Sequence, residues 1–216
     1  MSELVLYGPH YSAYTRTAWL TLLEKGVDFR LQEVPFTPGG GLPAEHLSRH
    51  PFAKVPVLEH DDFVLYETAA ICRYIDLAFP GPALQPAEPR RLARMTQIIG
   101  VLDSYLSHHI RMGLAAQLIF RPLRGEATDE AVVEDAAAVV RKGLPAFEAI
   151  VRADGYLVGG ELPSLADFHA IPLFDFLLNC PDGETFLADL PNLKNWWHGI
   201  KLRPSVVATR PRQFAA

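Results

Sequence analysis

Two short segments, Lys54–Leu58 and Glu67–Thr68, carry residues that together could bind a small acidic peptide. Pro56 interrupts a strand-like run, and because proline cannot donate to a sheet ladder it indicates an edge, a bulge or a cis bond. Such a bend would turn the amide and carbonyl of Val55 outward, free to pair with an extended peptide. The second segment lies where a helix is expected to begin, and the unpaired amides of a helix start receive carboxylates. The two segments therefore predict a peptide-pairing edge beside an anion pocket.

A small sheet is needed to hold these segments together, and the N-terminal part of the chain predicts one. Leu4–Tyr7 has the composition of a buried strand that stops at Gly8. From about Ala13 to Lys25 apolar residues repeat on one helical face, and Gly26 suits the C-cap of that helix. We expect a further strand over 29–34, a short helix over 44–48, strands around 57 and 64, and a helix over 67–79. This βαβαββα order predicts a small mixed α/β sheet covered by helices.

A proline-rich stretch, Pro80–Pro89, separates this region from a second one with a different pattern. Beyond it no strand is expected, and helical periodicity covers residues 89–120, 128–153, 164–179 and 191–202. Ser164 and Asp167 form a capping box at the start of the third of these helices, a structural feature worth roughly 1 kcal/mol. The chain therefore predicts two domains, an α/β domain over 1–82 and an all-helical (all-α) domain over 90–216.

Composition excludes several classes of protein. The formal net charge is −5 and 49% of the residues are hydrophobic, so we expect a globular protein that binds neither nucleic acid nor an anionic membrane. No apolar run approaches the roughly 20 residues of a membrane span, and no secretory signal is expected. Two cysteines, Cys72 and Cys180, lie far apart without a C-x-x-C pair. A reduced, cytoplasmic protein is therefore expected.

Four ordered motifs resemble those of the soluble (cytosolic) glutathione transferases. Val55–Leu58 followed by Tyr66–Ile71 is similar to the glutathione-binding signature of that family, and His50–Pro56 matches its Asn/His-Pro-Phe-x-x-Val-Pro motif. The start, Tyr7–Arg16, is similar to the serine-bearing start of the plant and bacterial phi-like and theta-like classes. Ser164–Phe168 matches the capping motif of the family's C-terminal domain. The resemblance covers nearly the whole chain and implies a thioredoxin-like N-terminal domain followed by an all-helical C-terminal domain.

The resemblance also implies an activity. It describes a homodimeric detoxification enzyme, a glutathione transferase, that adds the glutathione thiolate to a small hydrophobic electrophile. Glutathione is consumed as a co-substrate, and no metal or organic cofactor is implied. Two alternatives remain open: a glutathione-dependent peroxidase or isomerase on the same fold, and a noncatalytic transferase-like binding module. The sequence does not identify the electrophile, because variable helical positions line its pocket.

Ser12 stands at the start of the first predicted helix, and the resemblance implies that it stabilises the glutathione thiolate. A free thiol has a pKa of about 8.5, and lowering it by roughly two units takes only about 2.7 kcal/mol, within reach of one hydroxyl and a helix terminus. In one alternative Ser12 is only the N-cap of this helix. In another, Tyr7, Tyr11 or Tyr14 activates the thiol, because other classes of the family use a tyrosine near the end of the first strand.

The same resemblance implies which residues contact glutathione. Glu67 would meet the ammonium group of the γ-glutamyl unit, and Thr68 would meet its carboxylate. Val55 would pair through its backbone with the cysteinyl unit, in a geometry that Pro56 sets. Lys54 would reach the glycyl carboxylate.

One position departs from the family pattern. Phi-like proteins often carry a His-Lys pair for the glycyl carboxylate, and Gly41 and Leu42 stand at the matching positions here. Either Lys54 and Arg16 compensate, or glutathione binds weakly, or the second anchor is missing. His46 is a further candidate nearby.

By the family's layout, the helix that contains residues 105–112 faces the cleft between the domains and lines the electrophile pocket. The candidate pocket residues are Tyr11, Tyr105, His109, Met112 and Phe120, with core packing as the alternative. Phe52 resembles the aromatic key that inserts into the partner subunit of dimeric members, with a core role as its alternative. His108 and His109 are adjacent on a helix and point apart, so no metal site is expected.

Overall fold

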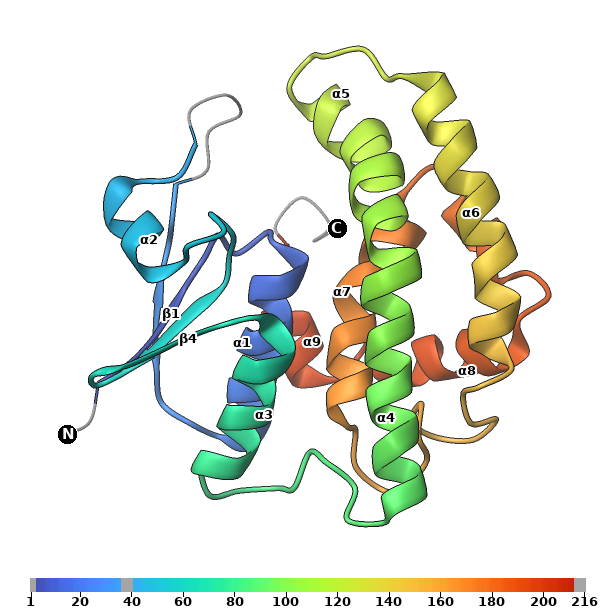
Figure 1. The fold of residues 1–216 in the computed structure, drawn as a ribbon. Coiled ribbons are helices and arrows are strands. Elements are labelled where there is room, and N and C mark those ends of the chain that lie inside the picture. Colours follow the sequence, from blue (N-terminus) through green and yellow to red (C-terminus); the bar gives the residue numbers. More distant parts are fainter. Residues whose placement is uncertain (1–2, 36–40, 212–216) are drawn as a thin grey trace. The chain divides into compact units, whose positions relative to one another are not determined.

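The computed structural model describes residues 3–35 and 41–211. The chain forms two compact units (Figure 1). The N-terminal unit contains Met1–Gln85 together with Pro204–Ala216, and the helical unit contains Pro86–Arg203. The N-terminal unit has the expected thioredoxin-like α/β fold, and the described part of the helical unit consists of helices and loops, so the predicted fold class is confirmed.

A four-stranded sheet organises the N-terminal unit. Its strands are β1 (Leu4–Tyr7), β2 (Arg30–Gln32), β3 (Val57–His60) and β4 (Phe63–Tyr66), in the order β2-β1-β3-β4. β1 pairs in parallel with β2 and antiparallel with β3, and β3 pairs antiparallel with β4. The observed β2 is shorter than the strand expected over 29–34. The register joins Tyr7 to Val57 and Val57 to Tyr66, which brings one end of each of these three strands to a single edge of the sheet.

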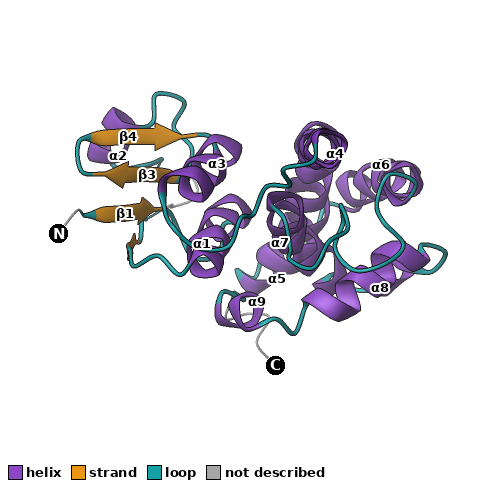
Figure 2. Ribbon diagram, turned by 90° about the horizontal axis from the view of Figure 1, so that it is seen from below, coloured by secondary structure: helices purple, strands orange, loops and turns teal. Residues whose placement is uncertain are grey.

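Three helices cover this sheet, with α1 (Ala13–Lys25) and α3 (Thr68–Ala78) on one face and α2 (Ala44–Arg49) on the other (Figures 1 and 2). Gly26 closes α1 with a φ of 68°, a left-handed conformation that glycine adopts without steric cost. Leu6 and Leu58 are fully buried in the core of this unit. A second apolar cluster contains Val5, Tyr7, Val34 and Val57. The central strands β1 and β3 therefore contribute buried residues to the core, and the loops of the sheet are left to form a site.

Two buried cations bind the N-terminal unit together in ways that no local pattern indicated. The guanidinium of Arg16 donates from Nε to Thr209 Oγ1 and from Nη2 to the Val206 carbonyl, both at 3.1 Å, and so fastens α1 to α9 (Pro204–Ala208) and the residue after it. Lys25 Nζ lies 3.0 Å from Asp76 Oδ1 and also donates to the Pro82 carbonyl at 2.9 Å. The ends of α1 and α3 and the following proline-rich stretch are thereby joined.

The helical unit begins with one long helix. It runs through α4 (Pro89–Val101), η1 (Leu102–Leu106), η2 (His109–Phe120) and α5 (Arg121–Leu123), and in η1 and η2 the turns widen to the π form. The remaining helices are α6 (Glu130–Glu148), α7 (Leu165–Asn179), η3 (Gly183–Leu187) and α8 (Pro191–Ile200). The positions of α6, α7 and α8 agree with the helices predicted after the proline-rich stretch, although α6 ends at Glu148 and not near 153, and η3 was not predicted. α7 is buried over most of its length and forms the centre of this unit.

A glycine allows η2 and α6 to pack closely. A Cβ atom placed on Gly113 would lie 2.2 Å from the Cβ of Ala136, whereas one placed on Gly100 of α4 would meet no atom within 4 Å. We therefore expect Gly113→Ala to force the two helices apart and to lower the free energy of unfolding by about 1–3 kcal/mol, the usual cost of overpacking. Gly100→Ala is the matched control, and it should be neutral or stabilising because alanine is the better helix former. Thermal unfolding of the two variants compares them, and equal melting temperatures would contradict the expected packing.

Asp167, from the predicted capping box, has a larger role than capping α7. Its carboxylate is fully buried and accepts hydrogen bonds from the Ser164 amide at 2.7 Å and the Ser164 hydroxyl at 2.8 Å. It also accepts from the Leu157 amide at 3.0 Å and from Trp196 Nε1 at 2.8 Å. Burial raises the pKa of Asp167, and these hydrogen bonds act in the opposite direction. One side chain thus joins the loop before α7, the start of α7 and α8.

Candidate functional site

Three loops of the N-terminal unit leave the sheet at the same edge. Because Tyr7, Val57 and Tyr66 pair across β1, β3 and β4, the residues after Tyr7, before Val57 and after Tyr66 begin side by side. These loops carry the sequence-predicted residues Ser12, Lys54–Pro56 and Glu67–Thr68. The strand register therefore brings together the peptide-pairing edge, the anion pocket and the candidate thiol-activating serine.

The segment before β3 has the predicted shape. The Val55–Pro56 peptide bond is cis, Val55 is half-buried and Pro56 is buried. Within residues 3–35 and 41–211, no hydrogen bond engages the main chain of Val55. Its amide and carbonyl are thus unpaired within the described residues, and their pairing with an extended ligand stays a prediction.

Glu67 lies at the N-cap position of α3 in an unusual conformation. Its φ of 72° and ψ of 115° are rarely adopted by a residue with a side chain, and such strain, costing on the order of 1–3 kcal/mol, is concentrated at functional sites. The Glu67 side chain makes no capping hydrogen bond to α3 and is exposed, while Thr68 is buried. The carboxylate of Glu67 thus does not cap α3, and the first amides of α3 are left for another acceptor.

Ser12 caps α1. Its Oγ accepts a hydrogen bond from the Thr15 amide at 3.3 Å, and its own amide donates to the Pro9 carbonyl at 3.0 Å. The first turn of α1 contains no acidic residue, so the positive end of the helix dipole is not offset by a local carboxylate. The N-cap role considered from the sequence is therefore present. It does not compete with thiol activation, since the capping bond uses a lone pair of Oγ and leaves its proton to be donated.

The three tyrosines considered as alternatives to Ser12 differ in their surroundings. The Tyr7 hydroxyl donates to Glu59 Oε2 at 2.6 Å, and burial followed by this hydrogen bond raises the pKa of Tyr7. Burial, and next the charge of Glu33, raises the pKa of Tyr11. Tyr14 lies half-buried in α1. Because Tyr7 already donates its proton to a carboxylate of the sheet, its geometry favours a structural role.

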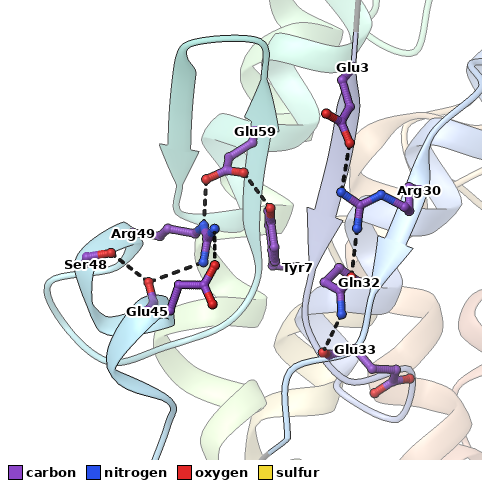
Figure 3. A network of polar contacts seen from close by, with 9 residues as sticks. All are labelled: Glu3, Tyr7, Arg30, Gln32, Glu33, Glu45, Ser48, Arg49 and Glu59. Carbon is purple, nitrogen blue, oxygen red and sulfur yellow. Dashed lines mark hydrogen bonds and ion pairs between the residues drawn. The ribbon is translucent and has the colours of Figure 1, made fainter.

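A polar network fastens α2 to the sheet (Figure 3). Arg49 Nε lies 2.6 Å from Glu59 Oε1, Arg49 Nη2 lies 2.8 Å from Glu45 Oε1, and the guanidinium stacks 4.4 Å from the centre of the Tyr7 ring. Burial alone would raise the pKa of Glu59, but the hydrogen bonds from Tyr7 and Arg49 outweigh it and hold that pKa below its ordinary value. The helix that precedes the Val55 segment is thus fixed in place.

This network predicts a pH-dependent contribution to stability. Because the folded-state pKa of Glu59 is lowered, its stabilisation is present above the unfolded-state pKa of about 4.3 and is lost as the pH falls through the folded value. We expect Glu59→Gln to lower the free energy of unfolding by about 1 kcal/mol at pH 7 and by much less at pH 3. Urea unfolding of both proteins at the two pH values measures this, and a difference independent of pH would contradict it.

Arg16, expected near the glycyl carboxylate, is engaged elsewhere in this structure. Its side chain is 1% exposed and hydrogen-bonded to Thr209 and Val206. A contact with a ligand would require those buried bonds to be exchanged, so the geometry favours a structural role. Lys54 is exposed beside Val55 and remains the basic residue placed at the predicted edge.

The positions that replace the family's His-Lys pair are not polar anchors. Gly41 is exposed with a φ of 73°, and Leu42 packs against the cluster of Val5, Tyr7, Val34 and Val57. His46 is only 3% exposed, and its Nε2 lies 2.7 Å from the Lys54 carbonyl. A direct contact between His46 and a ligand, considered from the sequence, is therefore not favoured. The hydrogen bond between His46 and the Lys54 carbonyl was not predicted. The sequence pattern indicates the helix α2, but it does not indicate where a polar side chain on the inner face of that helix points.

The electrophile-pocket candidates are divided between the two units, with Tyr11 in the N-terminal unit and the others in the helical unit. Tyr105 is 67% exposed and Met112 is 50% exposed, whereas His109 is half-buried and Phe120 packs edge-to-face on Phe176 at 5.6 Å. Their common pocket stays a prediction.

Phe52, the predicted dimer contact, is 67% exposed and packs edge-to-face against Tyr66 at 6.2 Å. Its insertion into a partner stays a prediction. In the described ranges, no group of three or more His, Cys, Asp or Glu residues is arranged to hold a metal ion. None of the described helices is long and apolar enough to span a membrane.

Two family models match the chain. The model described as the glutathione S-transferase N-terminal domain matches residues 11–78, and the one described as the glutathione S-transferase C-terminal domain matches residues 111–204. The first match contains the Val55 segment, Glu67, Thr68 and Ser12. The second contains α6, α7 and α8.

Individual proteins are similar over nearly the full length. The chain is 35% identical over 211 residues to glutathione S-transferase 3 of Zea mays, covering 97% of this chain and 94% of the relative. Its structure is similar to that of glutathione transferase F7 from Populus trichocarpa, with a TM-score of 0.83, 30% identity and coverage of 95% and 97% of the two chains. It is also similar to glutathione S-transferase I from maize, solved with an atrazine–glutathione conjugate, with a TM-score of 0.79, 29% identity and 96% coverage of each chain.

Proposed function

The chain belongs to the glutathione S-transferase family, and from that premise we propose that its N-terminal unit binds glutathione along the Val55 edge and activates the thiol with Ser12. The enzyme is a glutathione transferase, which joins the glutathione thiolate to a small electrophile. The observation that carries the proposed site is the strand register, because it gathers the loops of Ser12, Val55 and Glu67 at one edge of the sheet.

Each part of the tripeptide has a matching group in this proposal. The free amide and carbonyl of Val55 pair with the cysteinyl unit, and Pro56 shapes that edge. The Glu67 carboxylate, which is exposed and does not cap α3, receives the γ-glutamyl ammonium. The Thr68 amide and hydroxyl, at the start of α3, receive the γ-glutamyl carboxylate. Lys54 is the exposed cation available to the glycyl carboxylate, and Arg16 takes no direct part.

Ser12 supplies the activation. Its Oγ accepts from Thr15, so its hydroxyl proton is directed to the glutathione sulfur, where it stabilises the thiolate more than the neutral thiol. The positive end of α1 acts in the same direction. Together they need to supply about 2.7 kcal/mol to lower the thiol pKa by roughly two units. The bound thiolate then attacks an electrophile held nearby, and proximity supplies the rest of the rate enhancement.

The class of the enzyme, its oligomeric state, its location and its electrophile pocket are assigned from the residues described above. We assign the enzyme to the phi-like serine class, because Ser12 occupies the N-cap of α1 and the relatives above are plant glutathione transferases. A homodimer with Phe52 as a contact is supported by the exposure of that ring. A reducing, cytoplasmic location is supported by Cys72 and Cys180, which are both buried and form no disulfide within the described residues. The electrophile pocket is assigned to Tyr11, Tyr105, His109, Met112 and Phe120.

Calorimetric titration with glutathione, followed by a conjugation assay with a halonitroarene, tests this proposal. We expect saturable binding below millimolar concentration and release of halide with formation of the glutathione conjugate. Binding with turnover of hydroperoxides or isomerisation but no conjugation would contradict the conjugating role and favour the peroxidase or isomerase alternative. Absence of binding at millimolar glutathione would overturn the site and favour a noncatalytic module.

A further inference from the structure

Resting on the proposed function, we propose that His46 is a positioning residue for glutathione binding. Its imidazole holds the carbonyl of Lys54 and thereby aims the amide of Val55 at the cysteinyl unit of the tripeptide. His46 does not touch the ligand in this account. It acts through one peptide group of the binding edge.

The hydrogen bond of His46 defines its tautomer. Nε2 lies 2.7 Å from the Lys54 carbonyl oxygen, and because a carbonyl can only accept, Nε2 carries the proton. Nδ1 is buried without a hydrogen-bond partner among the described residues. The ring is 3% exposed. Within the part of the chain that the structure describes, the hydrogen bond of this ring is thus to the segment that precedes Val55.

The geometry of the peptide group transmits this contact to Val55. The Lys54 carbonyl and the Val55 amide belong to one planar peptide unit, which is trans, so the C=O and N–H point in opposite directions. Holding the carbonyl inward against buried His46 directs the amide outward, where no main-chain acceptor engages it within the described residues. A hydrogen bond on the carbonyl also polarises the peptide and strengthens its N–H as a donor.

α2 provides a fixed support for this bond. Arg49, three residues after His46, is held by Glu59 of β3 and Glu45. The His46 ring lies 6.5 Å from that of His50, which in turn stacks at 4.7 Å on Tyr66, the residue before Glu67. One helix and the turn after it therefore support both the Val55 and the Glu67 side of the site. Gly41 and Leu42 offer no side chain for a direct polar contact with the ligand. The contribution of α2 to the site is therefore indirect.

Three substitutions separate positioning from simple packing. His46→Phe keeps a ring and removes the donor, His46→Gln places an amide nitrogen near the position of Nε2, and His46→Asn is too short to reach the carbonyl. We measure the dissociation constant for glutathione by calorimetry, and kcat and both KM values with a halonitroarene. Loss of one hydrogen bond predicts that Phe and Asn raise the dissociation constant and KM for glutathione about five- to ten-fold.

The positioning role also predicts what stays constant. At saturating glutathione, kcat and the KM for the halonitroarene should remain within about twofold of the wild type, and His46→Gln should bind glutathione nearly as the wild type does. Unchanged glutathione affinity in His46→Phe would overturn the inference. If the Phe variant does not fold, the Gln and Asn variants decide, and equal glutathione affinities of these two would overturn it. Failure of the Gln variant to fold would show a purely structural residue and would overturn it too. If the wild type itself does not bind glutathione, the proposed function fails instead.

Discussion

Replacing Ser12 by Ala should lower kcat/KM for conjugation near pH 6.5 by about 5- to 10-fold. Without the hydroxyl proton the bound thiol returns toward its free pKa of about 8.5, and the fraction present as thiolate at pH 6.5 falls about 50-fold. The intrinsic nucleophilicity of the thiolate rises with its pKa and recovers a part of this loss. Initial rates with a halonitroarene across pH 5.5 to 9 measure the change, and the deficit should shrink as the pH rises.

The same residue caps α1, so the two roles must be separated. Ser12→Asp keeps a good N-cap, because aspartate accepts from the Thr15 amide as serine does, but it offers no proton and adds a negative charge beside the sulfur. Ser12→Gly removes the hydroxyl and costs only a few tenths of a kcal/mol as a cap. Both variants should therefore fold with near wild-type stability and conjugate poorly. A Ser12→Asp enzyme with full activity at pH 6.5 would contradict the role assigned to the hydroxyl.

The largest effect on stability is expected at Asp167. Asp167→Ala leaves the buried amides of Ser164 and Leu157 and the indole N–H of Trp196 without their acceptor. Each unsatisfied buried donor costs about 1–3 kcal/mol, so we expect a loss of roughly 3–5 kcal/mol in the free energy of unfolding after relaxation. Denaturant unfolding followed by tryptophan fluorescence measures it.

Two milder variants calibrate this result. Asp167→Asn retains one acceptor oxygen and should cost less than Asp167→Ala, and Trp196→Phe removes a single donor while keeping an aromatic ring. We expect the loss in the free energy of unfolding to be larger for Asp167→Ala than for Asp167→Asn. Trp196→Phe loses the packing of the indole and one hydrogen bond of about 1 kcal/mol. A denaturation midpoint of Asp167→Ala equal to that of the wild type would show that water satisfies the released donors.

The elements of the fold could be predicted from the sequence because their signals are local. Gly26 ends α1, apolar periodicity indicates the helices, and the proline-rich stretch Pro80–Pro89 separates two regions of different pattern. The capping box of Ser164 and Asp167 is also a local signal, and the sequence predicted a contribution of roughly 1 kcal/mol to stability from it. The contacts of Asp167 with Leu157 and Trp196 depend on how α7 packs against distant segments, so no local pattern could indicate them.

The site was predictable where a residue's role depends on its own loop. The cis bond before Pro56 and the start of α3 after Glu67 lie as their segments predicted, while the contacts of these residues with a ligand stay predictions. Arg16 illustrates the opposite case, because its position near Ser12 suggested a ligand contact while its partners Val206 and Thr209 come from the far end of the chain. His46 is similar, since only the packing of α2 reveals that its ring points at the Lys54 carbonyl.

The pKa of the glutathione thiol bound to the wild type and to Ser12→Ala tests the central claim most directly. The thiolate absorbs in the ultraviolet, so a pH titration of each complex reports it without an electrophile. The account predicts a bound-thiol pKa of about 6.5 in the wild type and one near 8.5 in Ser12→Ala. Equal values in the two complexes would contradict thiol activation by Ser12.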